Sequence, residues 1–276
     1  MNEILENYKK YLITRGYSLY YLNVMRIFLT YLEEQKIEPN NLNQSIITDF
    51  FALHSDYCSG TKNSYIKAGR SFYEFLGIKD SAWVKIKLMK VPQKIPEYFT
   101  EKMLEEAKKQ IITNHSRKMT PLKIRTILDF LYYTGIRKSE LLALKRKDID
   151  LENNIAKVWG KGDKERIICF PKKVSKELTE FFMSCNEENN ALNIKLGQLH
   201  YLIKMINKCC GINIHVHSFR HGYAKTCLKK GIDLPTLSRL LGHVSVLTTM
   251  IYANPSTEEM QENYQAKMNK GDKDES

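Results

Sequence analysis

Six residues between positions 137 and 252 carry side chains that suit chemistry on a phosphate ester. They are Arg137, Lys161, His217, Arg220, His243 and Tyr252. Arginine matches phosphate oxygens with two parallel N–H donors and stays charged at any working pH. A tyrosine hydroxyl becomes a nucleophile when a base takes its proton. We therefore interpret the set as a phosphoryl-transfer site, in which cations stabilise negative charge on phosphorus while the tyrosine attacks it.

Short-range spacing brings several of these side chains together. His217 and Arg220 are three residues apart at a predicted helix start, so both can face one way. Glu140 follows Arg137 by three residues and can hold its guanidinium, although a salt bridge to the next turn explains Glu140 nearly as well. No cluster of acidic residues indicates a Mg²⁺ site. We expect neither a metal nor a cofactor.

The elements that position these residues are mostly helices. From about residue 100 onward, apolar periodicity and end signals predict helices over 100–113, 121–134, 136–147, 172–184, 195–210, 218–230 and 234–241. Two β-rich runs in NIAKVWGKGDKERIICF flank Gly-Lys-Gly-Asp and predict a hairpin. Lys161 stands at the tip of that hairpin, where Lys164 is the alternative functional lysine.

Four short helices are predicted in the first 78 residues, within segments 6–16, 18–37, 43–57 and 61–77. Ser18 and Thr61 stand where N-caps belong, and Gly16 and Gly77 where helices stop. KVPQKIPEYFT contains two prolines and reads as an extended linker. The chain therefore divides into two domains.

Charge indicates a polyanionic partner. The chain has 43 basic and 31 acidic residues, a net charge of +12, and residues 97–256 hold 27 of the basic against 16 of the acidic ones. Neutralising phosphates with such side chains releases counterions and supplies affinity.

Composition also bounds the location. No apolar run approaches the roughly 18 residues of a membrane span, and the start lacks the pattern of a signal peptide. Six scattered cysteines without a C-x-x-C pair indicate reduced thiols and no zinc site. We expect a cytoplasmic protein without a membrane partner.

Segments around the six residues resemble, in order, the signature boxes of the tyrosine recombinases, the phage integrase family. They read TGIRKSELLALKRKDID, VWGKGDKER, HSFRHGYAKTCLKKGIDLPTLSRLLGH and TTMIY. The spacing agrees as well: 24 residues from the first arginine to the lysine, 23 from the second arginine to the last histidine, and nine from there to the tyrosine. The compact Xer-type recombinases are the most similar, over about residues 3 to 255.

The resemblance implies a mainly α fold of two domains. Residues 1–80 would form a four-helix core-binding (SAM-like) bundle, and 81–99 a linker. Residues 100–256 would form the mostly helical catalytic domain with a small antiparallel sheet. The tail, 257–276, could add a helix that docks on a neighbouring protomer.

The resemblance also implies a mechanism. Arg137 and Arg220 would clamp the scissile phosphate, with Glu140 supporting the first arginine, and Lys161 would protonate the departing 5′ oxygen. The remaining three roles fall to residues near the end of the chain. His217 would act as general base, His243 would hydrogen-bond the phosphate, and Tyr252 would form a 3′-phosphotyrosine.

The partner implied is double-stranded DNA at a specific recombination site, with four protomers on two sites exchanging strands through a Holliday junction. The natural role would be Xer-like chromosome-dimer resolution or integration and excision of a mobile element. Lys62, Lys67 and Arg70 lie on one predicted helix of the first domain and are candidate DNA contacts. Two alternatives are relaxation of supercoils in the manner of type IB topoisomerases, and a catalytically silent DNA-binding factor.

One box departs from the family pattern. Val216 stands where proline is frequent, and His215 is an additional histidine. The three-residue spacing to Arg220 nevertheless favours His217 as the histidine that faces the phosphate. His221, directly after that arginine, is typical of the family and is interpreted as structural.

Overall fold

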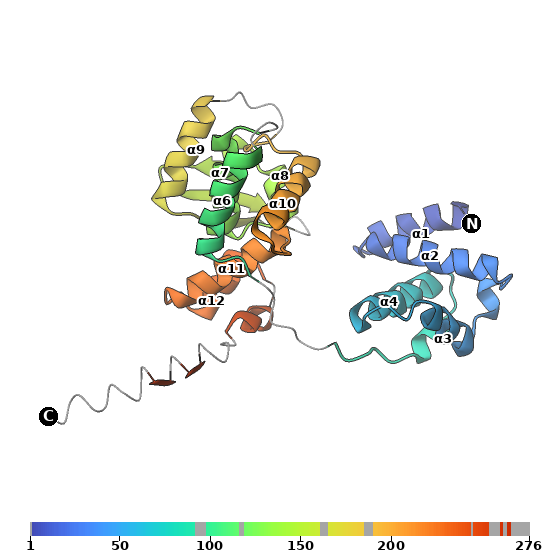
Figure 1. Cartoon of the computed structure of the whole chain (residues 1–276). Coiled ribbons are helices and arrows are strands. Elements are labelled where there is room, and N and C mark those ends of the chain that lie inside the picture. Colours follow the sequence, from blue (N-terminus) through green and yellow to red (C-terminus); the bar gives the residue numbers. More distant parts are fainter. Residues whose placement is uncertain are drawn as a thin grey trace. The chain divides into compact units, whose positions relative to one another are not determined.

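The computed structural model of the chain describes residues 2–91, 98–115, 119–160, 165–184, 190–243, 245–253, 260–261 and 264–265. It contains two compact units, Met1–Lys94 and Ile95–Ser276 (Figure 1). Each unit has its own hydrophobic core. The fold is mainly helical with a small antiparallel sheet, as the sequence predicts.

The first unit is all-helical in its described part. Its elements are α1 (Asn2–Thr14), α2 (Tyr20–Glu34), the 3₁₀ turn η1 (Pro39–Asn41), α3 (Gln44–Leu53), α4 (Ser59–Phe75) and α5 (Ala82–Lys85). Gly16 and Gly77 follow helix ends with positive φ, as expected. Thr61 is not an N-cap, because α4 begins two residues before it, with Cys58 at the cap.

The first unit extends past residue 80, into the range that we expected to be linker. Trp83 of α5 is fully buried and packs edge-on against Phe28, with ring centroids 4.8 Å apart. Gly69 of α4 makes room for it, because a Cβ at this position would lie 2.3 Å from the indole. Arg70 fixes α5 by donating to the carbonyls of Trp83 and Ile86. Four helical residues show no periodicity, so the sequence pattern did not reveal α5.

The second unit surrounds a central helix. Its helices are α6 (Glu101–His115), α7 (Pro121–Thr134), α8 (Lys138–Ala143), α9 (Lys172–Ser184), α10 (Leu196–Cys210), α11 (Val216–Lys229) and α12 (Leu234–Leu241). Helix α7 packs against α6, α9 and α11. It begins at a proline after the capping Thr120 and ends at Gly135, whose φ of 58° is in the left-handed region.

The predicted helix over 136–147 is shorter than expected. Helix α8 stops at Ala143 because Leu144 is extended and its carbonyl accepts the backbone N–H of Ala191. A 3₁₀ turn, η2 (Arg146–Asp148), then leads into a strand that the sequence pattern missed.

The small sheet is a three-stranded antiparallel one in the order β1 (Ile149–Asp150), β2 (Ile155–Trp159) and β3 (Glu165–Cys169). Its hairpin is confirmed, while its tip, with Lys161 and Lys164, lies outside the described residues. Ala156 pairs with Ile168 and Val158 with Arg166, so this arginine lies on the face of the sheet that carries buried residues. Helix α12 packs against β3.

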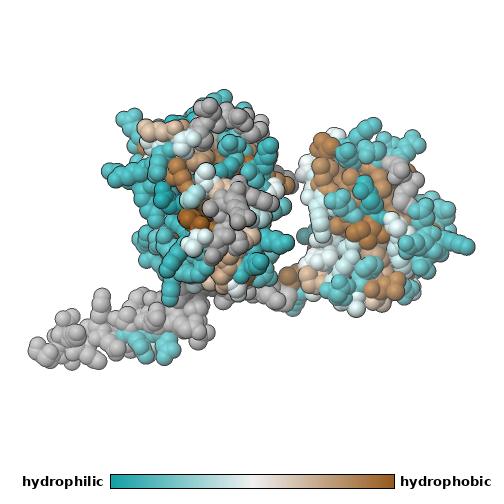
Figure 2. All heavy atoms as spheres, turned by 45° about the horizontal axis from the view of Figure 1, so that its top comes forward, coloured by the Kyte–Doolittle hydropathy of each residue, from teal (hydrophilic) through white to brown (hydrophobic). Residues whose placement is uncertain are grey.

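The visible surface of both units is largely hydrophilic, with apolar patches between the polar residues (Figure 2). In the described part of the chain, no helix is long and apolar enough to cross a membrane.

We predict that Gly69→Ala destabilises the first unit by about 2 kcal/mol, because the new methyl group must displace a fully buried indole. The control is Gly60→Ala in the same helix, where the nearest atom would be the Cys58 Sγ at 3.9 Å. Alanine there should leave stability unchanged or slightly raised. Urea unfolding followed by tryptophan fluorescence, with Trp159→Phe in every protein so that Trp83 gives the signal, measures both variants. Equal stability would contradict the close contact.

Candidate active site

Five of the six predicted functional residues lie in described parts of the second unit, and short contacts link four of them. Arg137 and Arg220 approach the end of α12, directly before His243. Tyr252 is in a 3₁₀ turn, η4 (Met250–Tyr252), that packs against α11. Lys161 lies outside the described residues.

Helix α12 ends in three carbonyl groups that each accept a guanidinium. Arg166 donates through Nη1 to Leu240, and Arg220 through Nη2 to Leu241. Arg137 donates through Nη2 to the Gly242 carbonyl at 2.8 Å. The last carbonyls of a helix lack intrahelical partners and carry its negative dipole end, so cations suit this place. The three arginines come from three different elements and are brought together by one helix terminus.

A single carboxylate joins two of these arginines. Glu140 is 2% exposed and accepts Arg137 Nη1 at 2.8 Å and Arg166 Nη2 at 2.6 Å. It also accepts the backbone N–H of Arg137 at 2.8 Å, which caps α8. Burial opposes its charge, but the hydrogen bonds from Arg166 and Arg137 outweigh burial and lower the pKa of Glu140. The contact with Arg137 that we considered from the spacing is present.

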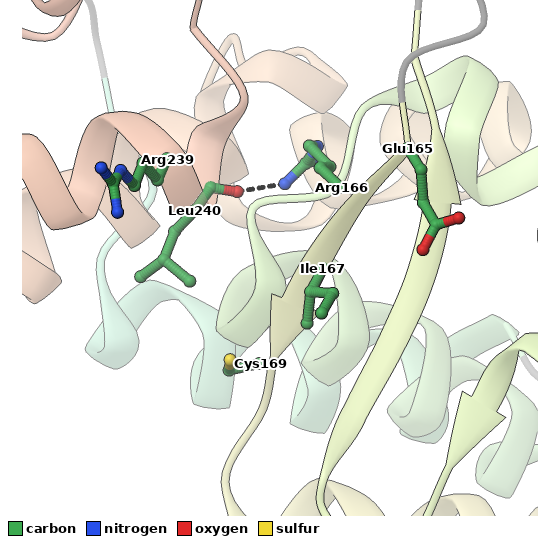
Figure 3. A pocket seen from close by; sticks show the side chains of 6 residues that line it. All are labelled: Glu165, Arg166, Ile167, Cys169, Arg239 and Leu240. Carbon is green, nitrogen blue, oxygen red and sulfur yellow. Dashed lines mark hydrogen bonds between the residues drawn. The ribbon is translucent and has the colours of Figure 1, made fainter.

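Arg166 is a residue that our sequence interpretation missed. Its side chain is only 9% exposed, and Figure 3 shows it reaching from β3 to the Leu240 carbonyl while Arg239 points away. The sequence contained one signal for this arginine: it is two residues from the buried Ile168 on a predicted strand, so both side chains point to the same face of the sheet. The two arginines border a cavity of about 490 Å³, lined by Glu165, Arg166, Ile167, Cys169, Arg239 and Leu240.

Arg220 is the most deeply placed of the three cations. It is 4% exposed, and its Nη1 donates to the Gly135 carbonyl at 2.8 Å. Burial, followed by the charges of Arg137 and Arg166, lowers its pKa to about 9. Arg137 and Arg220 thus each use two of their roughly five N–H donors on the fold, and each holds a charge that an anion would stabilise.

The environment lowers the pKa of both histidines of the set. Burial and then the charges of Arg220 and Arg137 lower the pKa of His243 to about 4. Desolvation and the same two arginines also lower the pKa of His217, although its ring is exposed at the surface. Asn207 exchanges two hydrogen bonds with Ile214 and so fixes the chain just before α11, in which His217 is the second residue.

Thr249 connects His243 to Tyr252. Its buried hydroxyl lies 2.8 Å from His243 Nδ1, and its carbonyl accepts the backbone N–H of Tyr252 at 3.0 Å. Tyr252 is 5% exposed, packed with Tyr223 and Leu237. Burial raises the pKa of Tyr252, and the charge of Arg220 partly offsets that effect. The tyrosine is therefore a protonated phenol within the electrostatic reach of the buried arginine.

The hydroxyl of Tyr252 meets a histidine that we interpreted as structural. It lies 2.8 Å from Nδ1 of His221, and the two ring centroids are 5.4 Å apart. Among the described residues, the Tyr252 hydroxyl forms its hydrogen bond with His221 and not with His217. No group of three or more His, Cys, Asp or Glu side chains in the described part is placed to hold a metal.

The candidate DNA contacts of the first unit lie on α4. Lys67 is exposed, and the Lys62 ammonium lies 5.8 Å from the centre of the Phe51 ring. Arg70 donates its Nε and Nη2 hydrogens to the carbonyls of Trp83 and Ile86, so it has a structural role whether or not it contacts DNA.

Residues 101–259 match the phage integrase family. The chain is 29% identical to the tyrosine recombinase XerA of Thermococcus kodakarensis over 273 residues, covering 94% of this chain and 93% of that protein. It is 30% identical to the tyrosine recombinase XerC of Staphylococcus aureus over 256 residues, covering 86% and 85%. These alignments cover most of both units.

Solved structures agree in fold. A XerA recombinase crystal structure is matched with a TM-score of 0.53 at 25% identity, over 96% of this chain and 98% of that one. XerH in a post-cleavage complex with palindromic difH substrate is matched with a TM-score of 0.70 at 22% identity, over 91% and 81%.

We predict that Arg166→Ala lowers the free energy of unfolding of the second unit by about 3 kcal/mol, because it removes one partner of a buried ion pair. The matched control is Arg239→Ala, since Arg239 lines the same cavity but is exposed, and should cost less than about 0.5 kcal/mol. Urea unfolding followed by circular dichroism compares them. Similar losses in both variants would show that the buried pair adds nothing.

Proposed function

The chain belongs to the phage integrase family and is a tyrosine recombinase, and we propose that it cuts and rejoins DNA through a covalent 3′-phosphotyrosine at Tyr252. The observation that carries this proposal is the buried phenol of Tyr252 beside Arg220, whose charge already acts on it. Of the three guanidiniums at this place, those of Arg137 and Arg166 share the Glu140 carboxylate. That of Arg220 has carbonyl partners, so the site holds excess positive charge that a phosphate would balance.

Each catalytic group has a task in this reaction. Arg137 and Arg220 bind the non-bridging oxygens of the scissile phosphate and stabilise the charge that develops on them. His243, fixed by Thr249, donates a further hydrogen bond to the phosphate. Tyr252 attacks the phosphorus, its proton passes to a histidine of α11, and Lys161 protonates the departing 5′ oxygen. The chain's own cations do the work for which other phosphoryl-transfer enzymes use metal ions.

The DNA partner is supported by fold and charge together. XerH, whose fold this chain shares, is seen with its difH substrate, and the Tn1549 integrase with circular-intermediate DNA. Beside His217 lies a cleft of about 410 Å³ whose lining includes Lys138, His200, Lys204 and His215 and no acidic residue. Such a surface suits the phosphate backbone flanking the reacting bond. Lys62 and Lys67 would add contacts from the first unit.

A specific recombination site and an assembly of four protomers on two such sites complete the proposal. Strand exchange needs the 5′-hydroxyl of a partner duplex, so protomers on two sites must act together. The tail over 257–276, mostly outside the described residues, is the segment that we propose to dock on a neighbouring protomer. Relaxation of supercoils by a monomer is not favoured, because named recombinases match the chain over both units.

We predict that the wild-type protein, incubated with sheared genomic DNA of its source organism and EDTA, forms covalent protein–DNA adducts that survive denaturation. Tyr252→Phe should form none, since it lacks the attacking oxygen. The matched control is Tyr264→Phe, an exposed tyrosine of the tail, which should form adducts as wild type does. Sequencing the captured ends identifies the site. Adducts in Tyr252→Phe, or none with wild type, would refute the proposal.

For the hairpin lysines, we predict that Lys161→Ala slows cleavage of a nicked duplex carrying that site by about 10²-fold or more, because the leaving 5′ oxygen loses its general acid. Lys164→Ala, three residues along the same hairpin, should change the rate less than about threefold. A duplex with a 5′-bridging sulfur, a leaving atom that needs no proton, should restore Lys161→Ala. The reverse pattern would assign the role to Lys164.

A further inference from the structure

We propose that His221 is a catalytic residue, the group that accepts the phenolic proton of Tyr252 as its oxygen attacks the phosphate. The assignment rests on the proposed function, because it names the proton acceptor of that same cleavage step. His221 is distinct from the histidine that family spacing favours, His217.

The geometry is that of a nucleophile and its base. Nδ1 of His221 and the hydroxyl of Tyr252 are 2.8 Å apart, within the range needed for direct proton transfer. Both partners are fixed by packing rather than by this bond alone. Tyr252 is 5% exposed in an apolar cluster, and His221 is half-buried on α11, directly after Arg220.

The direction of the hydrogen bond follows from the charge states. Burial raises the pKa of Tyr252, so the phenol keeps its proton. Burial and the nearby His217 and Arg220 lower the pKa of His221 to about 4, so its imidazole is neutral. A protonated phenol has one hydrogen to donate, so Nδ1 offers its lone pair and the ring hydrogen is on Nε2. The histidine is thus in the protonation state and tautomer that a base requires.

The positive surroundings that keep His221 neutral in the free protein change when DNA binds. A phosphodiester held by Arg137 and Arg220 brings a negative charge, and the transition state adds more. That charge offsets the field of the arginines and raises the basicity of His221 at the moment when the phenol loses its proton.

His217 is left for a different task. It is one helical turn before His221 on the same side of α11, and its ring is exposed. Desolvation and then the charges of Arg220, Arg137 and Lys138 lower its pKa, so it lies within the electrostatic reach of the arginines that we propose to bind the phosphate. His217 therefore binds the phosphate rather than the phenol.

The step balances. In cleavage, the bond from Tyr252 Oη to phosphorus forms and the bond from phosphorus to O5′ breaks. The phenolic proton moves to Nδ1 of His221, and Lys161 gives a proton to O5′. In rejoining, an incoming 5′-hydroxyl gives its proton to Lys161 and attacks phosphorus, and His221 returns its proton to the departing Tyr252 oxygen.

The test compares His221→Asn with His217→Asn in the full chain. Asparagine keeps an oxygen that can accept a hydrogen bond near the position of Nδ1 but cannot hold a proton at neutral pH. The probe is a nicked duplex carrying the site recovered from wild-type adducts, and the readout is the single-turnover rate of adduct formation. His221→Asn should be slower by about 10²-fold or more.

Trifluorotyrosine at position 252 separates proton transfer from positioning. Its phenol ionises more readily, so it should restore most of the lost rate in His221→Asn at pH 8. His217→Asn, slowed by loss of a phosphate contact, should not be restored. A wild-type rate in His221→Asn, or a slow rate that trifluorotyrosine does not restore, would overturn the assignment. Matching unfolding midpoints and DNA affinity confirm that the variants fold.

A measurement without DNA keeps this assignment separable from the proposed function. Long-range ¹H–¹⁵N spectra of the free protein should show His221 protonated on Nε2, with an Nδ1 signal that shifts in Tyr252→Phe. A proton on Nδ1 would overturn the assignment even if adducts form. Absence of any wild-type adduct would instead refute the proposed function, and this assignment with it.

Discussion

Three consecutive carbonyl groups at the end of α12 hold the cations of the active site in one place. They accept Arg166, Arg220 and Arg137 in turn. Gly242, the last of the three, has a φ of 62°, and a Cβ there would lie 2.4 Å from Arg166. Only glycine lets the chain turn while the guanidiniums approach so closely. His243 follows directly after this turn, so one helix end positions the three arginines and also the histidine.

The three guanidiniums carry more positive charge than the carboxylate beside them compensates, at the place where we propose that the phosphate binds. Among the described residues, Glu140 is the carboxylate that contacts these guanidiniums, and its two oxygens accept Arg137 and Arg166. Arg220 has carbonyl partners instead and is nearly buried, which is why its pKa falls to about 9. A buried cation without a carboxylate is costly until an anion arrives. The excess positive charge is therefore unfavourable in the free protein, and the phosphate of the proposed reaction would relieve it.

Hydrogen bonds connect Tyr252 both to His243, which follows α12, and to α11. Through Thr249 its turn is connected to His243, and through its hydroxyl it contacts His221, the neighbour of Arg220. Helix α11 thus carries Arg220, which we propose to bind the phosphate, and one residue later the histidine that contacts Tyr252. Adjacent residues on a helix point about 100° apart, so a single helix can face the phosphate and the tyrosine at once.

The sequence by itself determined the chemistry and the domain plan. Residue types with fixed spacing indicated the two arginines, the histidines and Tyr252 as candidates, and periodicity located most helices, because both signals are local. Only the tertiary structure decided which groups meet. Arg166 joins Glu140 and Leu240 across 26 and 74 residues, and His221 meets Tyr252 across 31. Contacts over such separations depend on how α7, α11, α12 and the sheet pack, which no local pattern encodes. The sequence pattern missed helix α5 for a related reason. The helix belongs to the core because Trp83 is buried against Gly69 of another helix, and the four residues of α5 alone do not show this.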